Sequence, residues 1–145
     1  MIRVKKVEND QEIKEAFKIR EVVFIEEQEC PVDEEFDGLD KDAIHFIAYI
    51  EGEAVGTCRY RMTDKGVKLE RFAVLKEKRG TGVGKRLVQT ALGHIDKKAH
   101  PSGTLLYLHA QVAAMPLYTR FGFEKIGEQF EEAGIDHFEM QKKVD

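Results

Sequence analysis

A glycine-rich stretch of this chain has the residue types and spacing of an anion site. Residues 79–85 read Arg-Gly-Thr-Gly-Val-Gly-Lys, after a strand-like segment, 67–75, and at the start of an amphipathic run, 83–99. Glycine lets the main chain close around an anion, and the first N–H groups of a helix have no internal partner. The helix dipole adds positive potential there. The stretch predicts a pyrophosphate site, although a plain turn into a helix could use the same glycines.

Two widespread phosphate loops do not fit this stretch. A P-loop requires Gly-x-x-x-x-Gly-Lys-Ser/Thr, and ending it at Gly84-Lys85 would put its first glycine on Arg79 and its hydroxyl on Arg86. The dinucleotide fingerprint Gly-x-Gly-x-x-Gly would put its last glycine on Lys85. The spacing therefore argues against both of these nucleotide-binding classes.

A second block, residues 111–123, completes a family pattern. The chain resembles the GCN5-related N-acetyltransferases (GNAT), whose phosphate loop reads Gln/Arg-x-x-Gly-x-Gly/Ala and whose late motif reads Asn-x-x-Ala-x-x-Leu/Phe-Tyr-x-x-x-Gly-Phe. Five residues fall on the late motif: Ala114, Leu117, Tyr118, Gly122 and Phe123. Gln111 stands where the family usually has Asn. Residues 20–24 and 27–28, Arg-Glu-Val-Val-Phe and Glu-Gln, resemble the uncharacterised bacterial ElaA/YjcF-like branch.

The resemblance implies acetyl-CoA as co-substrate and no metal. It implies two parallel strands, 67–75 and 104–111, that splay apart to hold the acyl-CoA. One of the main-chain N–H groups of Ala73 and Val74 would donate to the thioester oxygen, as in an oxyanion hole. The residues expected to bind the donor are Phe72, Ala73, Val74, Arg79, Gly80, Thr81, Gly82, Val83, Gly84, Lys85, Gln111, Ala114 and Tyr118.

Two residues are expected to carry the acid–base chemistry. Tyr118 is the expected general acid for the leaving thiolate, the role that this motif position has in the family, because a phenol keeps its proton at neutral pH. Glu70 shares a strand face with Phe72 and Val74 by the period of two, and it is the expected base for the amine. Each has a structural alternative, a core aromatic for Tyr118 and an exposed or salt-bridged glutamate beside Arg71 for Glu70.

Other nucleophiles and bases remain open alternatives. An imidazole titrates near neutral pH, so His45 and His109 are alternative bases, and both could instead be hydrogen-bonded structural residues. Cys30 and Cys58 lack metal-like spacing, and an acyl-cysteine route through either competes with a role as a plain core or loop thiol.

The hydrophobic pattern predicts one domain over 1–145 with the order β-α-β-β-β-α-β-α-β-β. Strands are expected at 2–7, 43–50, 54–62, 67–75, 104–110, 123–130 and 136–144, and helices from residue 9 or 10 through Phe24, at 83–99 and at 113–121. Residues 26–42 are expected to be a loop. The fold class is α/β (α+β), a mixed, mainly antiparallel sheet of about seven strands flanked by helices, as in GNAT domains.

Composition limits the partners. The chain has 145 residues, 34% charged and 42% hydrophobic, and a net charge of −4, which suits a soluble domain and argues against nucleic acid. No apolar run approaches a membrane span, and two isolated cysteines suit the reducing cytoplasm. The segment 26–42 holds nine acids and one lysine, so it is either a solvated loop or a negative rim that gathers a cationic amine.

We therefore expect an N-acetyltransferase that passes an acetyl group directly to a primary amine in a ternary complex. The acceptor would be a small molecule or a peptide, and the protein a monomer or homodimer. The alternative is a non-catalytic acyl-CoA sensor on the same fold.

Overall fold

Seven strands form one mixed sheet in the computed structural model, which describes residues 1–98 and 100–144. The order across the sheet is β1-β2-β3-β4-β5-β7-β6. The strands are β1 (Ile2–Lys6), β2 (Ile44–Ile50), β3 (Glu53–Met62), β4 (Val67–Val74), β5 (Leu105–Gln111), β6 (Glu124–Glu132) and β7 (Ile135–Lys143). All neighbours are antiparallel except β4 and β5. The expected mixed, mainly antiparallel sheet is confirmed.

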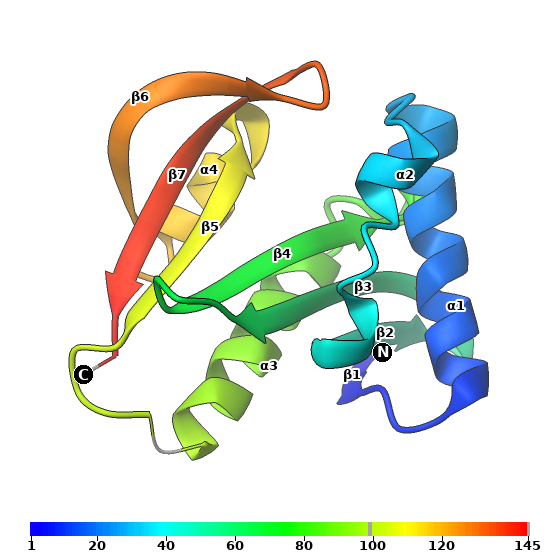
Figure 1. The fold of residues 1–145 in the computed structure, drawn as a ribbon. Helices are drawn as coiled ribbons and strands as arrows, with labels where there is room; N and C mark the ends of the chain where they lie inside the picture. Colours follow the sequence, from blue (N-terminus) through cyan, green and yellow to red (C-terminus); the bar gives the residue numbers. More distant parts are fainter. Residues whose placement is uncertain (99, 145) are drawn as a thin grey trace.

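The parallel pair opens almost at once. Val67 pairs with Leu106 and Lys68 with Tyr107, and the two strands then diverge (Figure 1). Gly66 stands just before this vertex, where an added Cβ would lie 2.3 Å from the Leu105 carbonyl oxygen. Only glycine allows the main chains to approach so closely. The splayed strands implied by the resemblance are therefore present, and their vertex is held by tight main-chain packing.

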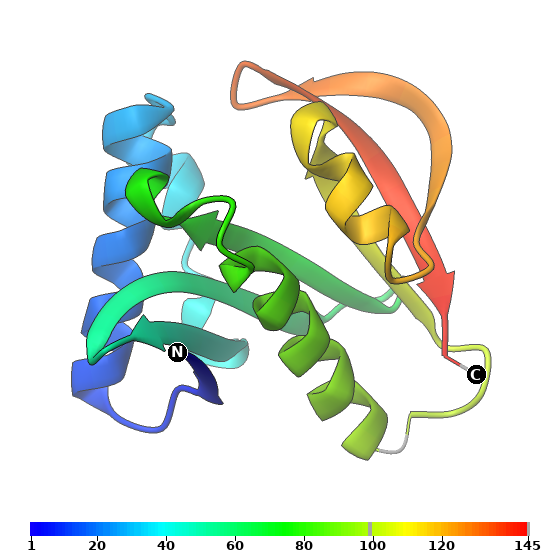
Figure 2. The same cartoon turned by 180° about the vertical axis from the view of Figure 1, so that it is seen from behind.

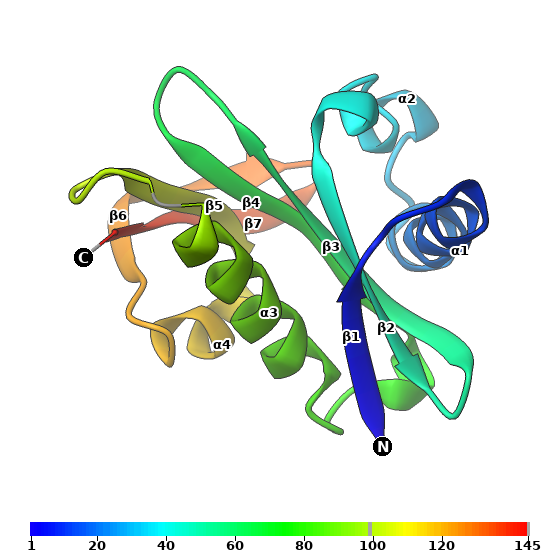
Figure 3. The ribbon, with the colours of Figure 1, turned by 90° about the horizontal axis from the view of Figure 1, so that it is seen from below.

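Helices cover both faces of the sheet. Helix α1 (Asp10–Arg20) and the short α2 (Val32–Glu35) lie on one side, and α3 (Val83–Lys97) lies on the other (Figure 3). Helix α4 (Met115–Thr119) follows β5 and lies near α3 (Figure 2). The Asn9 side chain caps α1 by accepting the Glu12 N–H at 2.9 Å. This cap agrees with the expected helix start, since Asn is among the favoured N-cap residues.

The main core lies between the sheet and α3. The apolar stripe of α3, which includes Leu87, Val88, Ala91 and Ile95, packs against β3, β4 and β5 residues such as Val55, Leu69 and Leu108. A smaller cluster on the opposite face joins Ile19 and Val23 to Ala73 of β4. Strand β4 is therefore packed from both sides, which fixes the strand that carries most of the expected site.

The first helix and the segment after it differ from the expectation. Helix α1 ends at Arg20, and residues Glu21–Glu27 continue as a wider π-helix. The segment 26–42 is not a plain loop, because it contains α2 and the 3₁₀ turn Asp40–Asp42. Ala99, the expected end of the long helix, lies outside the described residues. No helix in the described part of the chain is long and apolar enough to cross a membrane.

Candidate active site

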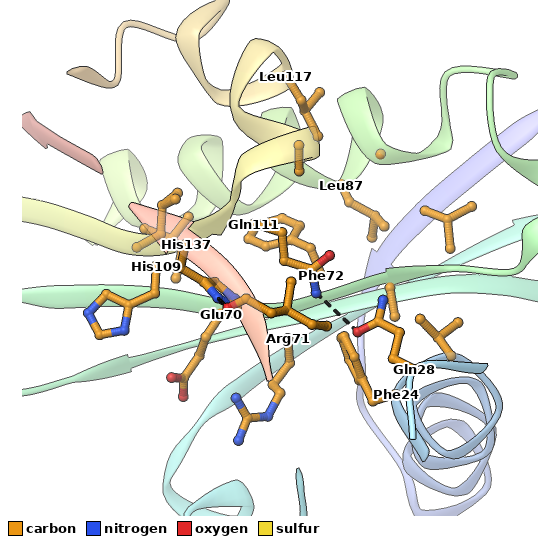
Figure 4. Close-up of a pocket in the computed structure, with 18 of the residues that line it drawn as sticks. Phe24, Gln28, Glu70, Arg71, Phe72, Leu87, His109, Gln111, Leu117 and His137 are labelled. Atoms are coloured by element: carbon orange, nitrogen blue, oxygen red, sulfur yellow. Dashed lines mark hydrogen bonds between the residues drawn. The ribbon is translucent and has the colours of Figure 1, made fainter. Parts of the chain in front are cut away.

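A cavity of about 860 Å³ occupies the opening between β4 and β5 (Figure 4). This volume is in the range of small-molecule sites. Most expected site residues line it: Glu70, Phe72, Ala73, Val74, Arg79, Gly80, Val83, Gly84, Gln111, Ala114 and Tyr118. Thr81, Gly82 and Lys85 are not part of the lining and lie in the loop and first turn at the start of α3.

One end of the cavity is the N-terminus of α3. Gly82 precedes the helix with φ 96°, a left-handed conformation that disfavours any other residue, and no side chain caps the helix. The Arg86 N–H reaches the Gly82 carbonyl at 3.1 Å and starts the helical ladder. The N–H groups of Val83, Gly84 and Lys85 therefore precede that ladder and can meet an anion.

Arg79 forms hydrogen bonds within the protein at this end of the cavity. Its Nη1 and Nη2 donate to the two carboxylate oxygens of Glu27 at 2.6 and 2.7 Å, and its Nε donates to the Val74 carbonyl at 2.9 Å. This bonding lowers the pKa of Glu27 below its ordinary value. A guanidinium has five N–H donors, so some remain for a phosphate. Arg79 thus holds the loop against β4 as well as lining the cavity.

Strand β4 has a bulge beside the cavity. Thr57 pairs with Ala73 and Arg59 with Glu70, so two residues of β4, Arg71 and Phe72, face one residue of β3. Arg71 adopts φ 59°, an uncommon conformation for a residue with a side chain. Beyond Lys68, β4 has no pairing with β5. The bulged main chain can therefore offer amide groups to a ligand in the cavity.

Tyr118 comes from α4 and lines the cavity wall. It is 5% exposed, and its ring meets the Phe72 ring edge-on at 5.5 Å between centroids. Burial raises the pKa of its phenol above the ordinary value. Among the described residues no hydrogen bond uses its hydroxyl. Tyr118 therefore keeps its proton at neutral pH.

Gln111 joins the two sides of the opening. Its amide Nε2 donates to Gln28 Oε1 at 3.0 Å, from the end of β5 to the segment after the π-helix (Figure 4). The Gln111 amide oxygen keeps its capacity to accept a hydrogen bond. A Gln in place of the family's usual Asn is thus part of a bridge across the cavity.

Glu70 is the centre of a buried ion cluster. Its Oε2 accepts from Arg59 Nε at 2.8 Å and Arg61 Nε at 2.7 Å, and Lys68 Nζ lies 3.3 Å from Oε1. Although burial opposes the charge, the hydrogen bond from Arg61 and the neighbouring cations lower the pKa of Glu70 to about 2. A carboxylate stabilised this strongly is a weak base. These contacts favour the ion-pair alternative over a role in deprotonating the amine.

The acidic segment forms the other half of this cluster. Glu35 is bonded by Arg20 Nε at 2.5 Å, and Asp40 Oδ1 by Arg20 Nη1 and Arg59 Nη1 at 2.6 Å each. Asp37 Oδ2 accepts from Arg59 Nη2 at 3.0 Å. Arg71 also reaches the Glu34 and Glu35 carbonyls. The expectations of a solvated loop and of an open negative rim both need correction, because arginines neutralise much of this charge.

Burial and hydrogen bonding argue against catalytic roles for three other expected candidates, His45, Cys30 and Cys58. His45 lies outside the cavity lining and its Nε2 bonds the Asp40 carbonyl at 2.9 Å, while burial lowers its pKa. Cys30 and Cys58 are free thiols whose pKa burial raises. A thiol must ionise to act as a nucleophile, so neither favours an acyl-cysteine.

A cluster on β5, β6 and β7 contains a residue that the sequence analysis missed. His109 Nδ1 lies 3.2 Å from Glu132 Oε1, and its Nε2 lies 3.4 Å from Glu139 Oε1. His137 is 6% exposed, lies opposite Gln111 in the sheet, and lines the same cavity. The alternation Ile135, His137, Glu139 was the available signal, but the register that brings it to the cavity is a property of the folded sheet.

Comparisons with known proteins agree with this architecture. Residues 6–144 match the family described as the acetyltransferase (GNAT) domain. YjcF of Bacillus subtilis (strain 168), an uncharacterized N-acetyltransferase, is 39% identical over 135 residues, 92% of this chain and 94% of YjcF.

Two solved structures share the whole fold. An acyl-CoA N-acyltransferase from Pseudomonas aeruginosa superposes with a TM-score of 0.85 at 27% identity, over 98% of this chain and 99% of that one. Escherichia coli ElaA superposes with a TM-score of 0.84 at 28% identity, over the same shares. With the splayed strands, the α3 anion end and the cavity between them, these matches show that the chain belongs to the GNAT acetyltransferase family.

Proposed function

We propose that this protein transfers the acetyl group of acetyl-CoA directly to a primary amine in a ternary complex. The observation that carries the proposal is the continuity of one cavity. It runs from the uncapped N-terminus of α3, along the unpaired edge of β4, to the phenol of Tyr118. A pyrophosphate, a chain of amides and a thioester require these three environments in this order.

The residues divide the chemistry among themselves. The α3 N-terminus and Arg79 bind the pyrophosphate, and the bulged main chain near Ala73 and Val74 polarises the thioester carbonyl. Losing one such main-chain donor typically costs about 3–4 kcal/mol of transition-state stabilisation. The amine attacks the polarised carbon, the carbon–sulfur bond breaks, and Tyr118 donates its proton to the leaving sulfur.

The acceptor enters from the side opposite α3 and α4. On that side the lining includes the carboxylates of Glu34 and Glu132 together with Phe24 and Gln28. Glu34 is exposed, and Glu132 is balanced by an imidazole rather than by an arginine. These two carboxylates favour a small cationic amine or the amine of a peptide. The paired acids of the segment 26–42 add little to that attraction.

The competing function is a non-catalytic acyl-CoA sensor, which would need the anion end of the cavity but not the phenol. Tyr118 lines the cavity with a protonated hydroxyl free to donate, and a sensor has no use for such a group. This feature favours the enzyme.

The donor site is tested by the melting temperature with and without acetyl-CoA, since a ligand selective for the folded state stabilises it. Gly82→Asp places a carboxylate at the anion end, and we expect it to abolish the rise. Gly52→Asp is the matched control, because Gly52 in the β2–β3 turn also has a positive φ, 82°. Equal acetyl-CoA stabilisation in both variants would contradict the anion site.

Catalysis is tested by a screen of primary amines that reads the release of free CoA. The panel should include polyamines, aminoglycosides, arylalkylamines and peptides with free amino termini. Acetyl-CoA binding with transfer to none of them would favour the sensor instead.

A further inference from the structure

The amine must lose a proton before it attacks, and Glu70 is held by three cations. The base therefore has to be found elsewhere in the cavity wall. Four other carboxylates line the cavity, and two imidazoles do so, His109 and His137. Their contacts distinguish them.

His137 has a fixed tautomer. Its Nδ1 lies 2.7 Å from the main-chain carbonyl oxygen of Ile135, and a carbonyl can only accept a hydrogen bond. Nδ1 of a neutral His137 must therefore carry the hydrogen, and Nε2 must carry the lone pair. The ring stacks on Phe130 at 5.8 Å between centroids, which holds its plane. His137 is thus an oriented proton acceptor at the cavity wall.

Glu132 lies on the same side of the ring as this proton-accepting nitrogen. Its Oε2 lies 3.8 Å from His137 Nε2, which is too far for a hydrogen bond, so this contact leaves the Nε2 lone pair available. Its other oxygen, Oε1, faces His109 Nδ1. His137 is thus oriented by the Ile135 carbonyl at Nδ1, and a carboxylate lies near Nε2, the nitrogen that would meet the ammonium.

The other groups have no comparable free lone pair. His109 has a carboxylate oxygen near each of its ring nitrogens, Glu132 near Nδ1 and Glu139 near Nε2. Both carboxylate oxygens of Glu35 are occupied, Oε2 by Arg20 at 2.5 Å and Oε1 by Arg71 at 3.1 Å. Asp37 is bonded by Arg59 and Arg71. Glu34 is exposed at the rim.

We infer that His137 is the catalytic base that deprotonates a primary ammonium acceptor, and that Glu132 is its positioning residue. This inference rests on the proposed function. Nε2 takes one proton from R–NH₃⁺, which leaves R–NH₂ and an imidazolium opposite Glu132. The amine lone pair forms the carbon–nitrogen bond to the acetyl group of acetyl-CoA, the carbon–sulfur bond breaks, and the departing sulfur takes the proton of Tyr118. The second amine proton is lost through solvent, from which the Tyr118 phenolate regains its proton, and the His137 imidazolium releases its proton to solvent.

The variant His137→Asn tests the base with little change to the fold. The Asn amide nitrogen occupies nearly the position of Nδ1 and can still donate to the Ile135 carbonyl, while nothing replaces Nε2. His109→Asn is the matched control in the same cluster. Acetyl-CoA stabilisation of the melting temperature, measured for both variants, establishes that the donor site is intact.

The decisive readout is how kcat/KM depends on the basicity of the acceptor, measured with ethylamine and with its β,β,β-trifluoro derivative. The fluorinated amine is far less basic and is mostly neutral at working pH, so it does not need the base. We expect His137→Asn to lower kcat/KM about 10²-fold for ethylamine and only a few-fold for the fluorinated amine. Glu132→Gln should show the same selectivity with a smaller loss, and His109→Asn should show little selectivity.

Two results would overturn the assignment of His137 without affecting the proposed function. The first is a wild-type rate of transfer to ethylamine by His137→Asn. The second is an equal loss of activity with both amines in this variant, which marks a structural role. If the wild-type protein acetylated no amine at all, the proposed function itself would fail. The activity of the wild-type protein therefore separates the two failures.

Discussion

Glu70→Gln separates a structural carboxylate from a catalytic one. Removing the charge leaves Arg59, Arg61 and Lys68 without their shared partner. The pKa of Glu70 is lowered from 4.5 to about 2, a difference of about 2.5, which at about 1.36 kcal/mol per unit of pKa corresponds to about 3.4 kcal/mol. Gln keeps one acceptor oxygen, so we expect a loss of about 2–3 kcal/mol. A single buried charge left unpaired has a cost of the same order.

The loss should appear as a lower melting temperature in thermal unfolding followed by circular dichroism. For a chain of this size, about 2–4 °C per kcal/mol predicts that the melting temperature falls by about 4–12 °C at pH 7. Glu128→Gln, an exposed glutamate on β6, is the matched control and should change little. Acetyl-CoA binding should persist in both variants.

The pH dependence gives a second check with a defined sign. The folded-state pKa lies below the unfolded value, so ionised Glu70 stabilises the protein above about pH 4.5, and this contribution disappears as the pH falls towards 2. The difference between wild type and Glu70→Gln should therefore shrink across that window. A variant with wild-type stability at pH 7 and an activity about 10²-fold lower would refute this reasoning and return Glu70 to the role of base.

Three other substitutions address the remaining parts of the cavity. Tyr118→Phe should keep acetyl-CoA binding and lower kcat about 10²-fold. Tyr107→Phe removes a β5 phenol that bonds Thr63 and should leave kcat unchanged. Equal kcat values in the two variants would make Tyr118 a core aromatic. Glu27→Gln should increase the affinity for acetyl-CoA up to about 5-fold in calorimetry, because it frees Arg79 from an exposed ion pair worth about 0.2–1 kcal/mol. Glu77→Gln is the control, since it removes a nearby charge that does not form this pair. An equal change in affinity in both variants would rule out direct competition between Glu27 and the ligand for Arg79. Glu34→Gln should raise the KM for the amine up to about 5-fold at low salt and leave kcat unchanged. If neither the substitution nor the ionic strength changed this KM, Glu34 would not belong to the acceptor site.

Local signals in the sequence were sufficient for the parts of the site that local chain geometry builds. The start of α3 could be predicted because glycine spacing and the amphipathic run that follows depend on neighbouring residues. The motif around Tyr118 placed a phenol on a short helix after a buried strand, and the structure has that helix as α4 at the cavity wall. The role of Tyr118 itself stays a prediction.

The charged parts of the site could not be predicted, because their partners come from distant segments. Glu35, Asp37 and Asp40 look solvated in the sequence, where one lysine opposes nine acids in the segment 26–42. Their actual partners, Arg20, Arg59 and Arg71, lie on α1, β3 and β4. The cations around Glu70 could not be predicted for the same reason, because Arg59 and Arg61 come from β3. The wider turns of Glu21–Glu27 also left no signal in the apolar periodicity.

His137 was missed because its surroundings depend on register. A shift of one residue between β5 and β7 would turn the imidazole to the α3 side of the sheet. Only the folded pairing of Gln111 with His137 brings it to the cavity.

The short contact between β4 and β5 has a consequence for the mechanics of the whole chain. Strands β1–β4 and strands β5–β7 form two blocks of the sheet. Among the described residues, just two cross-strand residue pairs, both between β4 and β5, connect the blocks. Hydrogen exchange in such blocks can proceed by separate opening events. Acetyl-CoA bound between β4 and β5 would act as a temporary extra strand and would join the two blocks into one cooperative unit. Amide protection in β5 and β7 should then rise together with that in β4 when acetyl-CoA binds, even at residues that do not touch it.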